Sequence, residues 1–226
     1  MSENKNYELQ LERIVFFSDA VFAIAITLLI IEIKVPHLEG ERRGVEFLQA
    51  VLDLLPKFIG YFLSFFVIGA YWSGHHRIYG YIERWDYTLV RRNIVFLSAI
   101  AFIPFATAFL SDYFTQFVPL ALYSLTLTAA GLLELYQWRY AVNNSLTSVA
   151  ADSAIAGQLG WRALAVPLAS VVVILVWLAA PRFATVGFAL IPVLQRIIDR
   201  RYRAAAAAET EDRRPEPASE NSSDIF

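Results

Sequence analysis

Six long apolar stretches, separated by short polar segments, dominate the pattern of hydrophobic and polar positions along this chain. About 20 mostly apolar helical residues cross the roughly 30 Å hydrocarbon core of a bilayer, and the stretches have about this length. The pattern therefore predicts an all-α integral membrane protein with six transmembrane helices per subunit. The predicted helices cover residues 13–33, 57–82, 91–112, 117–142, 162–180 and 183–198.

The remaining segments predict the rest of the organisation. Residues 45–55 are amphipathic but too short to span, so we expect a surface helix that leads to Pro56. After Arg203 a run of alanines gives way to a polar, proline-containing segment, which is typical of disorder. We therefore divide the chain into an N-terminal segment at 1–12, a transmembrane domain at 13–203 and a disordered tail at 204–226.

The charges add an orientation to this picture. The chain is 57% hydrophobic and has 19 Lys and Arg residues against 21 Asp and Glu residues. With six crossings and an inner N-terminus, 14 of the Lys and Arg residues fall on the inner side and 5 on the outer side. Positive residues accumulate on the cytoplasmic side of membrane proteins. We expect a multi-pass protein of the plasma membrane with both termini in the cytoplasm.

Candidate chemistry is sparse. There is no cysteine, and adjacent helical residues such as His75 and His76 point about 100° apart, so they do not chelate one ion together. No Walker loop or HExxH motif is present. We expect no metal site, no cofactor, no nucleic-acid partner and no enzyme activity. Glu134 and Gln137 are expected to be interfacial anchors or packing partners, and the arginines at 196–203 to set the topology and, secondarily, to contact anionic lipid.

The first predicted helix has two different faces. Ile24, Leu28 and Ile31 lie within about 60° of one another, in an apolar stripe that Thr27 flanks. Asp19 lies about 140° from Ile24 on the helical wheel, and an ionisable side chain at this depth should face protein or water. The pattern alone favours lipid contact or ordinary packing of the stripe over any more specific role.

Several motifs resemble one known family. R-x-x-x-F-S-D, formed by Arg13, Phe17, Ser18 and Asp19 and followed by AVFAIAITLL, resembles the signature of the transmembrane protein 175 family of potassium channels in its short prokaryotic form. Residues 71–77, YWSGHHR, resemble the W-x-x-H-H of the second helix in that family. In the third helix Asn93 precedes a run that ends in IPFATAF. The resemblance covers residues 13–110.

This resemblance implies a function and roles for the residues. It implies a homotetramer with a central pore lined by the first helix of each subunit, and potassium as the permeant ion. The constriction and selectivity residues would be Ile24, Thr27, Leu28 and Ile31. The residues that pack the pore helix would be Arg13, Phe17, Ser18, Asp19, Trp72, His76 and Asn93. Within this packing network we expect His76 to form a hydrogen bond with Ser18 or Asp19.

Two alternatives remain open. The chain could be a secondary transporter or a membrane-embedded enzyme that uses Arg13, Asp19 and His76 as a polar relay, although no second R-x-x-x-F-S-D motif marks a repeated half. Glu32, at the outer end of the first helix, could attract cations to a pore mouth or could simply pair with Lys34 at a solvated helix end.

Overall fold

The computed structural model describes residues 2–37 and 44–212, and within them the protein is built from helices. An isolated bridge joins Ile82 and Thr147. The elements in chain order are α1 (Ser2–Ile31), α2 (Gly44–Asp53), α3 (Leu55–Tyr79), α4 (Tyr87–Asp112), α5 (Phe117–Asn143), α6 (Ala154–Ala163), α7 (Ala165–Ala179), the 3₁₀-helix η1 (Pro181–Ala189) and α8 (Leu190–Asp212).

Five helical stretches are long and apolar enough to cross a membrane, which confirms the all-α class and places a candidate span at each of the first five predicted crossings. They are Tyr7–Ile31, Leu55–Tyr79, Tyr87–Asp112, Phe117–Asn143 and Ala154–Ala179. The fifth starts before the predicted Arg162 and is interrupted at Leu164, between α6 and α7. Pro167 lacks the amide hydrogen that a continuous helix would use at this point, which explains the break.

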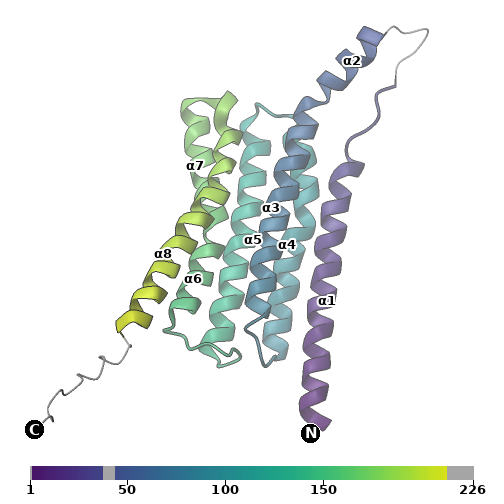
Figure 1. Ribbon diagram of the computed structural model, residues 1–226. Coiled ribbons are helices and arrows are strands. Elements are labelled where there is room, and N and C mark those ends of the chain that lie inside the picture. Colours follow the sequence, from purple (N-terminus) through teal and green to yellow (C-terminus); the bar gives the residue numbers. More distant parts are fainter. Residues whose placement is uncertain (1, 38–43, 213–226) are drawn as a thin grey trace, which may run out of the picture.

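The predicted sixth helix at 183–198 differs from the structure. Its first part is the 3₁₀-helix η1 and its second part is the start of α8, which carries Arg196, Asp199 and Arg200. Figure 1 shows α8 running back from the end of the bundle where α7 finishes towards the end where α1 begins. The segment therefore returns along the bundle without forming one long apolar helix.

The boundaries of the three predicted regions also differ. Helix α1 starts at Ser2, so the segment predicted as 1–12 is continuous with the first membrane helix. Helix α8 continues to Asp212, beyond the predicted domain end at 203. The rest of the predicted tail, 213–226, lies outside the described residues. The surface helix predicted at 45–55 is present as α2, and none of its residues is buried.

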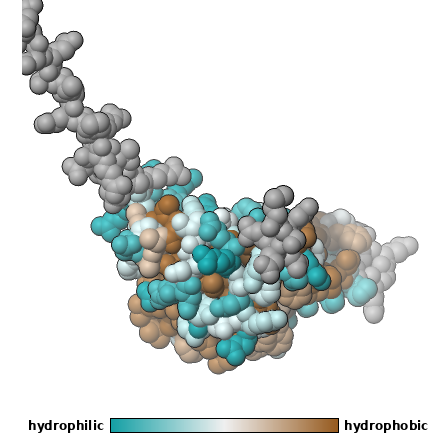
Figure 2. Space-filling model, turned by 90° about the horizontal axis from the view of Figure 1, so that it is seen from below, coloured by the Kyte–Doolittle hydropathy of each residue, from teal (hydrophilic) through white to brown (hydrophobic). Residues whose placement is uncertain are grey.

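The core lies where α4 and α5 pack against the other helices. Phe96, Ile100 and Ile103 of α4 and Tyr123 of α5 are completely buried. Helix α1 forms one edge of the bundle, and α7 and α8 lie at the other (Figure 1). Figure 2, which looks at the bundle from below, shows hydrophilic residues across this end and hydrophobic residues around the sides. This distribution suits a bundle whose sides face hydrocarbon and whose end faces water.

Candidate functional site

Helix α1 turns opposite faces towards the bundle and away from it. Ser18, Phe22, Ala25 and Leu29 are buried against the other helices, and their spacing of three or four residues is that of one helix face. On the opposite face the exposed fractions are 58% for Ile24, 40% for Leu28 and 57% for Ile31. The apolar stripe found in the sequence therefore has no cover within the described part of the chain.

Thr27 also lies on the exposed side of α1. Its hydroxyl is 3.0 Å from the carbonyl oxygen of Ala23 and 2.9 Å from that of Ile24, and it donates to this pair. A hydroxyl has one hydrogen and two acceptor lone pairs. The hydroxyl hydrogen of Thr27 is used within the helix. The lone pairs on its oxygen remain free, so this oxygen can accept a hydrogen bond or coordinate a cation.

A buried chain of hydrogen bonds holds the opposite face of α1. The Asn93 amide nitrogen donates to Ser18 Oγ at 2.9 Å, and Ser18 Oγ donates to the carbonyl oxygen of Ile14 at 2.8 Å. Asn93 Oδ1 lies 3.0 Å from His75 Nε2. The amide oxygen can only accept, so Nε2 of His75 is the protonated nitrogen. Helices α1, α3 and α4 are joined by this one chain of polar contacts.

The histidine in this network is His75, where the sequence analysis expected His76. His75 is 1% exposed, whereas His76 is exposed and its ring stacks on Trp72, with centroids 5.6 Å apart. His75 shares a buried helix face with Ser64, Ile68 and Tyr71, spaced three or four residues apart. That periodicity is present in the sequence and could have identified the correct histidine.

The other predicted packing residues divide into two groups. Trp72 Nε1 donates to Asp19 Oδ1 at 2.9 Å, so α3 has a second contact with α1. Arg13 and Phe17 are exposed, and Arg13 makes no hydrogen bond or ion pair with the described residues. Asp19 is hydrogen-bonded to Trp72, and His76 stacks on the same Trp72, so these two members of the alternative relay share a neighbour, but no hydrogen bond or ion pair joins them within residues 2–37 and 44–212.

A second polar cluster lies between α3, α5, α6 and α8, and sequence reasoning missed most of it. Arg162 Nη1 donates to both carboxylate oxygens of Asp199 at 2.5 Å, and the Gln158 amide donates to Asp199 at 3.0 Å. Partial burial alone would raise the pKa of Asp199, but the bonds and charge of Arg162 and the bond from Gln158 lower it below its ordinary value. Asp199 thus holds α8 against α6.

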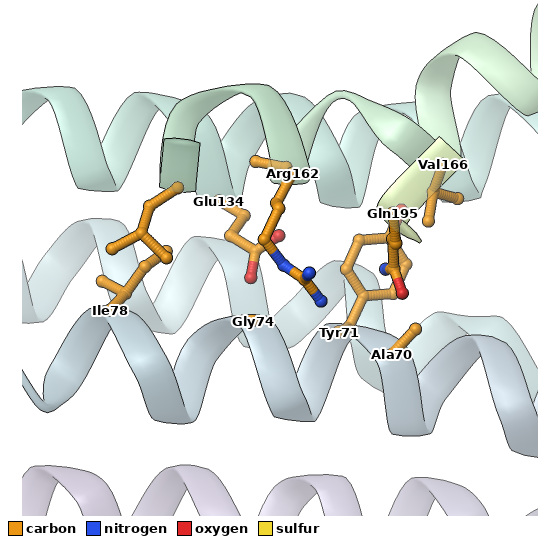
Figure 3. Close-up of a pocket in the computed structure, with 10 residues that line it drawn as sticks. Ala70, Tyr71, Gly74, Ile78, Glu134, Arg162, Val166 and Gln195 are labelled. Carbon is orange, nitrogen blue, oxygen red and sulfur yellow. The ribbon is translucent and has the colours of Figure 1, made fainter. Parts of the chain in front are cut away.

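Glu134 belongs to the same cluster and is only 4% exposed, so of its two predicted roles it has that of a packing partner and not that of an interfacial anchor. Figure 3 shows the Arg162 guanidinium reaching down from α6 beside the Glu134 carboxyl group, above Gly74 of α3. A Cβ atom at Gly74 would lie 2.5 Å from Glu134 Oε1, so only glycine leaves room for this carboxyl group. Within the described residues no three His, Cys, Asp or Glu side chains lie close enough to hold a metal ion.

Comparisons with known proteins agree with the motifs. Residues 13–104 match the family described as endosomal/lysosomal potassium channel TMEM175. A protein named potassium channel from Streptomyces collinus is 40% identical over 124 residues, which cover 53% of this chain and 59% of that protein. Another protein with this name, from Chamaesiphon minutus, is 43% identical over 102 residues, which cover 45% of this chain and 49% of that protein.

The sequence matches therefore span about half of these relatives, and the structural match extends further. The crystal structure of a lysosomal potassium-selective channel TMEM175 homolog from Chamaesiphon minutus superimposes with a TM-score of 0.67 at 27% identity. It covers 85% of this chain and 98% of that one. Residues 13–104, which carry the motifs of α1 and α3 and Asn93 of α4, therefore match the TMEM175 family, and the chain shares its fold with the channel homolog from Chamaesiphon minutus.

Proposed function

We propose that the chain is one subunit of a homotetrameric, potassium-permeable cation channel of the plasma membrane, and that α1 lines its pore. The observation that carries this proposal is the uncovered stripe formed by Ile24, Leu28 and Ile31, opposite a face of α1 that is fixed by buried polar contacts. Passive conduction through such a pore is the function that this geometry and the family relationship favour.

The stripe suits a symmetric pore for a physical reason. One narrow apolar face closes a ring only when symmetric copies surround an axis, and cyclic symmetry provides this. Rings of aliphatic side chains can gate a pore by excluding water. We propose that Ile24 forms the tightest ring, that Leu28 and Ile31 form rings towards the outer end, and that Thr27 provides hydroxyl oxygens between them.

The buried contacts explain how the stripe would keep its direction. Ser18 and Asp19 are tied to Asn93 and Trp72 on neighbouring helices, so rotation of α1 about its axis would break both bonds. We propose that these residues, with His75, orient the pore helix and do not touch the ion. For Arg13 and Phe17 the same role stays a prediction.

We also propose that the chain crosses the membrane six times, with η1 and the first turns of α8 as the sixth crossing. The return of α8 along the bundle supports this count (Figure 1), and so does the excess of Lys and Arg on the proposed cytoplasmic side. Both termini would then be cytoplasmic, with α2 on the outer surface.

The relay alternative finds less support, because Asp19 is hydrogen-bonded to Trp72 and His76 stacks on Trp72, with no hydrogen bond or ion pair that links Arg13, Asp19 and His76 among the described residues. A direct test of the channel is to reconstitute the purified protein in planar bilayers and record currents. We expect unitary currents without any coupling gradient and, with potassium on one side and sodium on the other, a reversal potential that favours potassium. A pH gradient in the same recordings measures proton permeation. Flux that requires a coupled ion, or no unitary current, would contradict the channel.

A further inference from the structure

An apolar groove runs along the side of the bundle between α3, η1 and α8. It encloses about 610 Å³, within the roughly 300–1,000 Å³ of typical ligand pockets. Its walls are formed mainly by Leu63, Phe66, Val186, Phe188, Ile191 and Pro192. The part of α3 that lines it runs from Ile59 to Ala70, about 16 Å at 1.5 Å per residue. The groove has the chemistry and length to hold a hydrocarbon chain.

A small polar cavity adjoins the inner end of this groove. Ala70 and Gln195 line both spaces, and the small cavity of about 10 Å³ is also lined by Glu134, Arg162 and Gly74 (Figure 3). A space of roughly 10–15 Å³ holds one water-sized group. The groove therefore leads from hydrocarbon to a single polar position in the bundle interior.

Two buried polar atoms in the small cavity lack hydrogen-bond partners among the described residues. They are Oε1 of Glu134, which is an acceptor, and Nε of Arg162, whose N–H is a donor. Arg162 uses its Nη1 for Asp199, and the Tyr71 hydroxyl donates to the carbonyl oxygen of Leu127. An unsatisfied buried polar atom is costly, so a group that both donates and accepts would stabilise this position.

We propose that the groove and the small cavity together bind a long-chain alcohol, with its hydrocarbon chain in the groove and its hydroxyl between Glu134 and Arg162. A hydroxyl donates one hydrogen bond and accepts others, so it can serve Glu134 Oε1 and Arg162 Nε at the same time. An ammonium group cannot accept from Arg162, and a carboxylate cannot donate to Glu134.

The test uses the full-length protein in phosphatidylcholine nanodiscs and a photoreactive diazirine derivative of 1-dodecanol. We expect labelled residues in α3, η1 and α8 along the groove. Unlabelled 1-dodecanol should compete about tenfold more strongly than dodecyl methyl ether, which can accept but cannot donate, and more strongly than dodecanoate. Equal competition by all three chains would mean a merely apolar groove and would overturn the proposal.

Two variants locate the site. Ala189→Trp fills the groove and should abolish specific labelling, whereas Ala179→Trp, on an exposed position of α7 outside the groove, should leave it unchanged. Glu134→Leu should remove the advantage of the alcohol over the ether; if this variant does not fold, the competition series in the unaltered protein still decides. Labelling that survives Ala189→Trp, or no labelling because lipid or a neighbouring subunit fills the groove, would refute the assignment.

Discussion

Helices α1 and α5 cross the same bundle, yet their hydrophobic residues serve different surroundings. The most apolar window of α1 has a mean hydropathy of 2.6 and is 22% buried, whereas that of α5 has a mean hydropathy of 1.5 and is 56% buried. The helix with the higher hydropathy is thus the less covered one. Burial within the subunit cannot be the reason for the apolar character of α1.

The difference teaches that the hydropathy of a membrane helix indicates contact with lipid or another apolar surface outside the subunit, and not burial in the core of the subunit. Helix α5 places small, polar and aromatic residues inside the bundle, among them Tyr123, Ser124 and Trp138. Close packing and hydrogen bonds between helices, more than hydrophobic exclusion, drive helix association in lipid. Helix α1 uses the same principle on one face only, at Ser18, and leaves Ile24 and Leu28 for lipid, a pore or a neighbouring subunit.

The largest effect on stability is expected in α5. Trp138 is 1% exposed and its indole N–H donates to the carbonyl oxygen of Ala156 at 3.0 Å. Trp138→Ala should lower the free energy of unfolding by about 3–5 kcal/mol, because it leaves a cavity and removes the hydrogen bond from the indole to α6. Thermal unfolding in detergent measures this. Trp161→Ala, at a 54% exposed position, is the matched control, and a similar loss there would contradict the burial argument.

The next largest effect concerns the ion pair beside α5. Asp199→Asn should cost about 1.5–3 kcal/mol, because Arg162 is buried and loses a charged acceptor. The pKa of Asp199 is lowered in the folded protein, so its contribution is complete above the unfolded pKa and is lost as the pH falls through the folded pKa. Below pH 4 the difference in unfolding midpoint between the two proteins should shrink. If the difference in unfolding midpoint instead grew as the pH fell, the stabilising role of the Arg162–Asp199 ion pair would be contradicted.

A smaller effect is expected on the inner face of α1. Asn93→Leu keeps the size of the side chain but removes the partner of both Ser18 and His75, at a cost of about 1–3 kcal/mol. His76→Ala should be nearly neutral, since His76 is exposed. Unfolding midpoints in detergent measure both. If His76→Ala lowered the unfolding midpoint more than Asn93→Leu, the assignment of His75 to the hydrogen-bond network would be wrong.

The exposed face of α1 should show almost no effect on stability but a change in conduction. Ile24→Asn should alter the free energy of unfolding by no more than about 0.5 kcal/mol, because the side chain touches little within the subunit. A polar ring should keep water in the constriction and raise the cation current. Ile30→Asn, exposed on α1 but away from the stripe, is the control in bilayer recordings. Equal currents from both variants would place the pore elsewhere.

The smallest change is Thr27→Val, which is nearly isosteric and removes the hydroxyl oxygen. We expect the potassium-to-sodium permeability ratio to shift while the total current changes little, since the oxygen lone pairs would no longer replace water around a partly dehydrated ion. Reversal potentials under bi-ionic conditions measure the ratio. An unaltered ratio would exclude Thr27 from selectivity.

The sequence by itself determined the membrane class, the positions of the five long apolar helices, the surface helix and the similarity to the TMEM175 family. Each depends on a local property: the length of an apolar run, a change in composition or a motif within one helix. The apolar stripe of α1 was also readable, because residues that share a helix face follow from spacing alone, whereas its exposure was seen only in the structure. These features do not require knowledge of which helices are neighbours.

Only the tertiary structure decided which polar residues meet. The choice of His75 over His76 depends on the rotation of α3 against α1 and α4, and the cluster of Glu134, Arg162 and Asp199 joins helices that are far apart in sequence. The sixth segment likewise became a 3₁₀-helix followed by α8. Contacts between helices depend on how side chains of several segments pack at once, and no single segment contains that information.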